Sequence, residues 1–262
     1  MKTELVVNHI VNWLKSYADN AGIKGFVVGV SGGIDSATTS TLCAMTGLDV
    51  LCLEMPIHQA ASHVSRAQEH IDQLTNRFSN ASGRRVDLTP VFEEFKTEVT
   101  MDGKDATVEM ALANTRARLR MTTLYYHAGL LGYLVAGTGN KVEDFGVGFY
   151  TKYGDGGVDL SPIADLLKSE VYKIGEFVGV PESIMKAAPS DGLFGDARSD
   201  EDQIGANYDE LEWAMAQNDL GKSVDDFEGR EREVFKIFKS FNTANKHKMV
   251  PIPVCEIPPE MR

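Results

Sequence analysis

The first residues with recognisable chemistry form a glycine-rich run, GVSGGIDS, from Gly29 to Ser36. The run follows an apolar segment and precedes a helical pattern, so its backbone N–H groups and the positive end of a helix can face a phosphate together. The adjacent Gly32 and Gly33 allow the backbone to approach a ligand closely. We therefore predict a nucleotide phosphate site at Gly29, Val30, Ser31, Gly32, Gly33, Ile34, Asp35 and Ser36.

An acidic residue, Asp35, stands among these phosphate donors. The run has neither the GK[ST] of a Walker A loop nor the GxGxxG of a dinucleotide fingerprint. A carboxylate here would repel phosphate unless a cation lay between them, and Mg²⁺ bridges carboxylate and phosphate oxygens in this way. The alternative is an ordinary strand-to-helix turn in which Asp35 favours the start of the helix. The SGGIDS run between a strand and a helix favours a nucleotide phosphate with Mg²⁺ held by Asp35.

A second polar run, GTGNKVED, follows the apolar segment from Leu130 to Ala136. Ligands of open α/β sheets collect at the carboxyl ends of the strands. Thr138 and Glu143 are therefore expected to face the first loop. We predict Glu143 as the second Mg²⁺ carboxylate; Asp144 and a solvated acidic turn are the alternatives.

The third run is YTKYGDGGVDLSPI, from Tyr150 to Ile163, and Lys168 follows it closely. Its glycines allow the backbone to wrap around a ligand. Lys152 and Lys168 offer positive charge to phosphates, and Asp159 can accept hydrogen bonds or pair with a lysine. A surface loop with exposed charges is the alternative.

These runs resemble motifs of a known superfamily and of one family within it. SGGIDS, residues 31–36, resembles the pyrophosphate-binding loop of the ATP pyrophosphatase superfamily, and TKYGDGGVD closely resembles the signature of the NAD⁺ synthetases. Three further segments extend the resemblance over most of the chain: NTRARLRM at 114–121, PSDGL at 189–193 and His247-Lys248. The resemblance implies that Thr138, Lys168 and Ser190 contact ATP. It implies contacts with deamido-NAD⁺ from Arg118, Lys152, Asp159, His247 and Lys248, the last two in a carboxy-terminal loop that is expected to close on the substrate.

The resemblance also implies a reaction, in which ATP adenylates deamido-NAD⁺ and ammonia then displaces AMP to give NAD⁺ and diphosphate. Asp159 and Lys168 are the expected catalytic residues, and Mg²⁺ is the expected metal. Ammonia is expected as the nitrogen donor because the first buried strand begins near residue 25, which leaves no room for the amidase domain of glutamine-dependent relatives. The family further implies a homodimer.

Two segments depart from the family pattern. The loop between Glu143 and Lys152 is one residue longer, and residues 56–66 do not match the usual adenine-contacting segment, so we assign no adenine contacts there. Two alternative functions stay open. One is another adenylating enzyme of the superfamily, such as a tRNA-modifying enzyme, and the other is a nucleotide sensor without turnover.

The composition narrows the possible partners and the compartment. A net charge of −12 argues against binding to nucleic acid or to anionic membranes. The three cysteines form no CxxC pair, which favours a reducing cytoplasm. Residues 121–140 carry no formal charge, but their apolar residues are too interrupted for a membrane span, and a helix end, a turn and a strand are expected there.

The elements that must position these groups alternate between β and α patterns. We predict one α/β domain over residues 1–262, a Rossmann-like parallel β-sheet with helices on both faces. The predicted strands are 25–30, 49–55, 85–88 and 130–136. The predicted helices are 2–20, 34–46, 60–78, 105–128, 165–178, 182–188, 207–217 and 230–243. Flexible loops are expected near 139–160 and 190–205, and an extended tail over 250–262.

Overall fold

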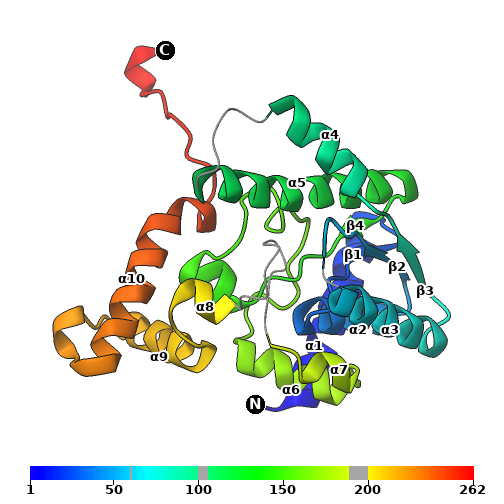
Figure 1. The fold of residues 1–262 in the computed structure, drawn as a ribbon, viewed down its shortest axis with the longest axis horizontal. Coiled ribbons are helices and arrows are strands. Elements are labelled where there is room, and N and C mark those ends of the chain that lie inside the picture. Colours follow the sequence, from blue (N-terminus) through cyan, green and yellow to red (C-terminus); the bar gives the residue numbers. More distant parts are fainter. Residues whose placement is uncertain (60, 100–105, 189–199) are drawn as a thin grey trace.

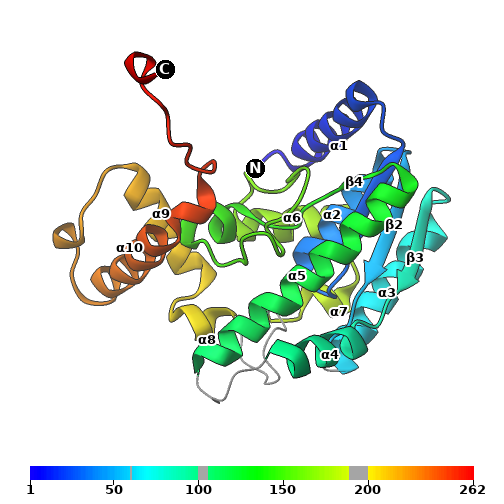
Figure 2. The same ribbon diagram turned by 90° about the horizontal axis from the view of Figure 1, so that it is seen from above.

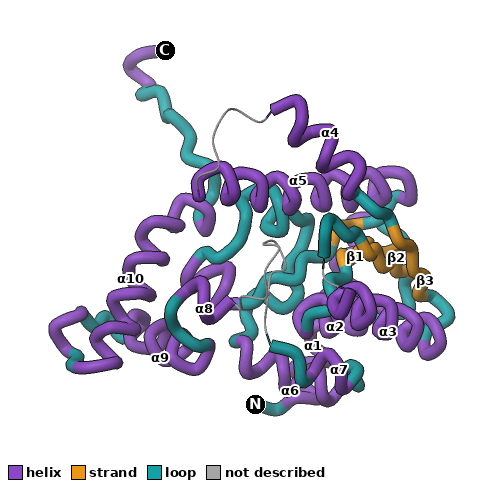
Figure 3. Tube along the Cα trace, in the orientation of Figure 1, coloured by secondary structure: helices purple, strands orange, loops and turns teal. Residues whose placement is uncertain are grey.

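A sheet of four parallel strands lies at one side of the molecule (Figures 1 and 3). The computed structural model describes residues 1–59, 61–99, 106–188 and 200–262. The strand order is β3-β2-β1-β4. The strands are β1 (Gly25–Gly29), β2 (Asp49–Glu54), β3 (Ala81–Arg85) and β4 (Leu134–Val135). Phe26 pairs with Val50 and with Leu134, which places β1 in the middle of the sheet.

Helices cover both faces of this sheet, because the strands alternate apolar side chains between two cores. Phe26, Val28 and Cys52 enter the larger core. Helices on that face are α1 (Thr3–Ala21), α2 (Ile34–Met45), α3 (Ala61–Arg77), α6 (Lys168–Val178) and α7 (Glu182–Met185). Val27 and Leu53 point to the opposite face, where α4 (Thr89–Val99) and α5 (Ala106–Leu131) pack. The predicted Rossmann-like fold with helices on both faces is confirmed.

A third apolar core lies away from the sheet (Figure 2). It is centred on Leu211, Phe235 and Phe238. The elements around it are the π-helix η1 (Val142–Val147), α8 (Asp200–Ile204), α9 (Tyr208–Asp219), the 3-10 helix η2 (Val224–Asp226) and α10 (Gly229–Met249). Beyond α10 the chain leaves the body as an extended tail that ends in the 3-10 turn η3 (Pro259–Met261), and the expected extended tail is thus confirmed except for that turn.

Several predicted boundaries are wrong. The predicted strand 130–136 begins too early, because α5 continues to Leu131 and ends at Gly132, whose φ of 68° stops the helix. The predicted strand 85–88 lies earlier, at Ala81–Arg85, where Ala81 is half-buried, the other four residues are exposed and no apolar pattern marks the strand. Helix α4 was not predicted, α6 begins at Lys168 instead of 165, and α10 extends six residues beyond the predicted end at 243 to Met249.

The loops that position the site are held by backbone hydrogen bonds. Gly137 N donates to Leu160 O at 2.8 Å, and Lys141 N donates to Leu166 O at 2.8 Å. These bonds bring the segment after β4 alongside the segment that leads into α6. The predicted loop at 190–205 falls largely on residues 189–199, which lie outside the described part of the chain, and its end forms α8. No helix in the described ranges is long and apolar enough to cross a membrane.

Candidate active site

The glycine-rich loop turns from β1 into α2 and is tied together by its two serines. Ser36 Oγ donates to Gly33 O at 3.0 Å and lies 3.2 Å from Ser31 Oγ, while Gly33 N donates to Ser31 Oγ at 3.3 Å. Gly32 has a φ of 83°, and an added Cβ would lie 2.6 Å from His63 O. Only glycine fits this position without strain, because α3 packs directly on the loop. Arg66 Nε fixes that contact by donating to Gly32 O at 3.2 Å.

A buried lysine lies between two carboxylates beside this loop. Lys168 Nζ donates to Asp35 Oδ2 at 2.6 Å and to Glu143 Oε1 at 2.9 Å. The Lys168 side chain is 4% exposed. Tyr208 completes the cluster, because its hydroxyl donates to Glu143 Oε1 at 2.6 Å and its ring lies 4.7 Å from Lys168 Nζ. The sequence predicted all three charged residues as site residues, and the structure brings them together.

Asn140 links the carboxylate of Asp35 to the backbone at Glu143, and the sequence analysis assigned it no role. Its side chain is fully buried. Asn140 Nδ2 donates to Asp35 Oδ1 at 3.0 Å, and Asn140 Oδ1 accepts from Val142 N and Glu143 N at 3.1 Å each. One amide therefore fixes Asp35 and begins the helical turn that carries Glu143. An asparagine in the short polar run that follows a buried strand was the available signal.

The charges in this cluster shift the pKa values of its members. Burial opposes the positive charge of Lys168, but Asp35 and Glu143 outweigh it and raise the Lys168 pKa above its ordinary value. Burial also opposes ionisation of Glu143, yet Lys168 and Tyr208 hold its pKa below the ordinary value. For Asp35 burial is the larger effect and raises the pKa. Burial, together with Glu143, Asp155 and Asp35, raises the pKa of Asp144 to about 8.

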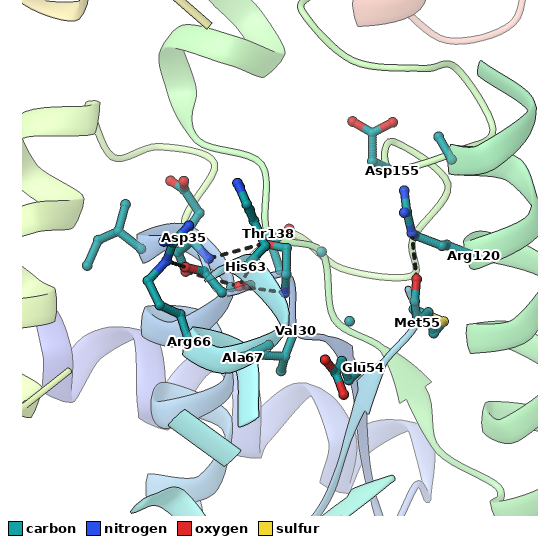
Figure 4. A pocket seen from close by; sticks show the side chains of 18 of the residues that line it. Val30, Asp35, Glu54, Met55, His63, Arg66, Ala67, Arg120, Thr138 and Asp155 are labelled. Carbon is teal, nitrogen blue, oxygen red and sulfur yellow. Dashed lines mark hydrogen bonds between the residues drawn. The ribbon is translucent and has the colours of Figure 1, made fainter. Parts of the chain in front are cut away.

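A pocket opens at the carboxyl ends of the strands over this cluster (Figure 4). The predicted residues that line it are Gly29, Val30, Ser31, Gly32, Gly33, Ile34, Asp35, Ser36, Thr138, Glu143 and Lys168. Further lining residues to which the sequence assigned no contact are Glu54, Met55, Gln59, His63, Arg66 and Arg120. Arg120 Nε donates to Met55 O at 3.0 Å, which joins α5 to the end of β2. The segment 56–66, which we left without adenine contacts, thus contributes part of the wall.

Four of the residues expected to bind the dinucleotide form a second network next to the pocket. Arg118 Nη2 donates to Lys152 O at 3.3 Å, and Lys152 Nζ donates to His247 O at 2.7 Å. Lys248 Nζ donates to Gly148 O at 2.9 Å and to Tyr150 O at 2.7 Å. The expected C-terminal loop is wrong, because His247 and Lys248 belong to the last turn of α10. The end of α10 is therefore bound to the TKYGDGG segment.

Asp159 lies elsewhere. Asp159 is absent from the pocket lining, and its carboxylate accepts from Tyr125 Oη at 3.0 Å and from Val135 N at 2.8 Å. These bonds hold the end of the TKYGDGGVD segment, at Asp159, against β4 and α5. Ser190 lies outside the described residues. The roles assigned to both stay predictions.

The donor set suits a magnesium ion held with phosphate. Within the ranges that the structure describes, no three His, Cys, Asp or Glu side chains gather into a protein-only metal cage. Asp35 and Glu143, however, already share one cation, the ammonium of Lys168. Mg²⁺ is commonly held by one or two carboxylates, with phosphate oxygens and water as its remaining ligands. The two carboxylates therefore fit Mg²⁺ that arrives with a nucleotide.

Comparison with known proteins gives consistent matches. The family model for NAD synthase matches residues 6–251. An NH₃-dependent NAD⁺ synthetase of Syntrophomonas wolfei is 35% identical over 266 residues, which covers 100% of both chains. That of Methanococcoides burtonii is 38% identical over 234 residues, 87% of this chain and 82% of that protein. The solved NMN synthetase of Francisella tularensis has a TM-score of 0.84 at 30% identity, and covers 98% of this chain and 100% of its own.

Proposed function

Because the chain belongs to the NAD synthase family, we propose that the pocket over Lys168 binds ATP beside the nicotinate carboxylate of deamido-NAD⁺. The activity is that of an NH₃-dependent NAD⁺ synthetase, a ligase that forms a C–N bond. A tRNA-modifying enzyme and a sensor without turnover are not favoured, since the curated relatives that match along the chain are NAD⁺ synthetases.

The observation that carries the proposal is the convergence on Lys168. Asp35 belongs to the phosphate loop, Glu143 to the segment after β4, and Lys168 to the start of α6. The three come from distant parts of the sequence, and their charged atoms meet at the mouth of a glycine-rich loop. A positive charge held by two carboxylates in that place supports binding of a metal-bound triphosphate.

The chemical problem is that a carboxylate is a poor electrophile. In the first step a nicotinate carboxylate oxygen attacks the α-phosphorus of ATP, the bond to the bridging oxygen breaks, and diphosphate leaves. In the second step ammonia attacks the carbonyl carbon, the bond to AMP breaks, and one proton passes to solvent. The protein contributes position and charge in both steps, and no protein nucleophile is needed.

The residues of the pocket divide these tasks. The backbone amides of residues 31–36 bind the phosphates, and Lys168 offers its ammonium to the leaving diphosphate. Thr138 lies at the end of β4 beside the loop and contacts the nucleotide. Asp35 and Glu143 would hold Mg²⁺, which supplies positive charge to the phosphate oxygens when it is bound. Ser190 is a further proposed ATP contact.

The network at the end of α10 is the proposed binding region for the dinucleotide. Arg118, Lys152 and Lys248 offer cations to its phosphates, and His247 would help to orient it. Their present bonds to backbone carbonyls hold these side chains in one region. Asp159 is proposed to face the nicotinate ring, where its charge suits a pyridinium.

The assembly and the compartment are also proposed. Exposed apolar side chains on α5, among them Tyr126 and Leu130 at 66% each, support a homodimer that covers this helix. Two of the three cysteines, Cys43 and Cys52, are buried thiols, and all three are free, which supports a reducing cytoplasm.

A direct assay tests the function. Purified protein is incubated with ATP, Mg²⁺, ammonium and deamido-NAD⁺, and NAD⁺ and AMP are quantified. Formation of the two in equal amounts is expected. Nucleotide binding without AMP release would refute the proposal.

A second candidate substrate is the nicotinate mononucleotide, and the likeness to the Francisella tularensis NMN synthetase favours it. Both acids expose the same carboxylate, so the pocket chemistry is unchanged. Competition between equal concentrations of the two acids distinguishes them. Preferential amidation of deamido-NAD⁺ is expected, and preferential formation of NMN would assign the mononucleotide.

A further inference from the structure

A buried glutamate, Glu54, ends β2 at the wall of the pocket. It is 3% exposed. Neither carboxylate oxygen has a hydrogen-bond partner among the described residues. The nearest cation is Arg85 on β3, whose Nε lies 3.7 Å from Oε2, beyond hydrogen-bond distance, and whose side chain is 54% exposed. The structure therefore leaves two buried acceptor atoms without donors.

Such an arrangement is unfavourable for the protein alone. An unpartnered buried acceptor retains its desolvation penalty, and a charged one retains more. Burial raises the pKa of Glu54 above its ordinary value, and Arg85 only partly opposes the shift. An apolar residue would continue the strand pattern of Val50 and Cys52 without this penalty. The position is therefore explained best by a donor that comes from a ligand.

The location of Glu54 points to one part of the ligand. Side chains alternate along β2, so Glu54 follows Val50 and Cys52 onto the face that carries Val30 and Ala67. Val30, Ala67 and Glu54 all line the pocket, and the carboxylate is turned toward the side where the other two lie (Figure 4). Glu54 thus lies on the same face as two apolar lining residues, Val30 and Ala67, and this combination suits a flat base or a sugar and repels a phosphate or a nicotinate carboxylate.

We propose that Glu54 recognises the nucleoside half of the triphosphate by accepting hydrogen bonds from its N–H or O–H donors. These donors are the 6-amino group of the base and the ribose hydroxyls. The phosphates occupy the neighbouring strand end, at residues 31–36, and adjacent strands lie about 4.8 Å apart. Rossmann dinucleotide-binding proteins, whose glycine-rich loop differs from this one, offer an analogy, because they place an acidic ribose acceptor about 20 residues after that loop. The inference rests on the proposed function, which supplies ATP as the triphosphate.

The test compares nucleotides in the full-length enzyme with NAD⁺ formation as the readout. The kcat/KM for ATP is compared with that for purine riboside triphosphate, which lacks the 6-amino group, and for 2′-deoxy-ATP and 3′-deoxy-ATP. The variants are Glu54→Met, which removes the acceptor at similar size, and Glu54→Gln, which keeps a neutral acceptor. Arg85→Gln is the matched control, because it removes the long ion pair and leaves Glu54 intact.

The wild type is expected to lose roughly 10- to 100-fold in kcat/KM with at least one of the three analogues, the range for a hydrogen bond to a charged group. The ratio of kcat/KM for ATP to kcat/KM for that analogue should fall to within about threefold of unity in Glu54→Met. It should be intermediate in Glu54→Gln and equal to the wild-type ratio in Arg85→Gln. The analogue that responds identifies the donor. A wild type that uses all three analogues like ATP, or a Glu54→Met variant that discriminates against the analogues as strongly as the wild type, would overturn the proposal. A wild type that binds ATP but forms no NAD⁺ would instead refute the proposed function, and calorimetric binding of the same analogues would then test Glu54 separately.

Discussion

Replacing the buried ammonium by an apolar side chain, Lys168→Met, tests the central cluster of the site. The two side chains have similar length, so packing against Tyr208 changes little, whereas the charge between Asp35 and Glu143 disappears. Asp35 keeps the amide of Asn140, and Glu143 keeps the hydroxyl of Tyr208. The variant thus retains two neighbouring buried carboxylates without their shared cation.

The expected loss in the free energy of unfolding is about 3–5 kcal/mol, the range measured when one partner of a buried ion pair is removed. The full range applies because the Lys168 side chain is only 4% exposed and solvent screening is small. For a chain of this size each kcal/mol lowers Tm by about 2–4 °C, so a decrease on the order of 10 °C is expected. NAD⁺ formation should also be lost, but that result alone would not separate binding from folding.

The stability measurement therefore includes a rescue and a pH series, both in EDTA without nucleotide. Adding Glu143→Gln to Lys168→Met removes one of the two repelling charges. The double variant should therefore recover at least about half of the decrease in Tm that Lys168→Met causes. In the single variant the mutual repulsion raises the carboxyl pKa values in the folded state above those of the unfolded chain. The folded state then binds more protons, so the variant loses stability as pH rises from about 4 and its deficit is larger at pH 8 than at pH 5. A Tm within about 2 °C of the wild type, or a double variant less stable than the single, would refute the reasoning.

Three further variants test the loop and its acidic neighbours. Asp35→Asn keeps the shape of the side chain but weakens a predicted Mg²⁺ ligand, so NAD⁺ formation should fall at least about 100-fold in a protein that still folds, and near-normal turnover would exclude the metal role. Its Tm should fall less than that of Lys168→Met, because Lys168 keeps Glu143 as a partner. Gly32→Ala should cost about 1–3 kcal/mol of stability, because its φ is 83° and the new Cβ would lie 2.6 Å from His63 O. The control is Gly33→Ala, with a φ of −98° and a nearest Cβ contact of 3.4 Å, and it should unfold like the wild type; equal Tm losses in both would contradict the argument. Asp144→Asn should stabilise the protein more at pH 9 than at pH 5, because the folded pKa of Asp144 is raised to about 8 and wild-type stability falls as pH rises from about 4 to about 8; a pH-independent difference in Tm would rule this out.

The phosphate loop could be predicted because all of its chemistry lies in one contiguous run. Gly29–Ser36 contains the strand end, the turn and the start of the helix, and each is specified by local residue types. The position of Glu143 could partly be predicted, since it follows a strand that ends at the same edge of the sheet. Lys168 was identified only from its place after the TKYGDGGVD run. Their direct contact could not be predicted, because it depends on a buried amide, Asn140, and on Tyr208 from a helix 65 residues beyond Glu143.

The boundaries around β4 could not be read from the sequence. Leu130–Ala136 is a continuous apolar run, and periodicity does not divide such a run between the end of a helix and a short strand. Gly132 makes the division, since its left-handed backbone ends α5 and directs the chain into β4. The sequence also did not show which face of α5 packs against the protein. Its apolar residues are scattered around the helix, so nothing in the sequence showed that Arg120 would line the pocket while Arg118 would contact the backbone at Lys152.

The protein and its ligands are both negatively charged, and the local structure of the site overcomes their repulsion. A chain with a net charge of −12 gathers Asp35, Glu143, Asp144 and Asp155 near one buried lysine, where a triphosphate must also fit. Backbone amides bind phosphate whatever the surrounding acidity, because their partial charges point directly at the ligand and act at contact distance. The carboxylates then favour a triphosphate that brings its own metal cation over one that comes without it. Under the proposed function, the acidic residues at this loop therefore select the metal-bound form of the nucleotide, whose inner phosphorus a weakly nucleophilic carboxylate can attack.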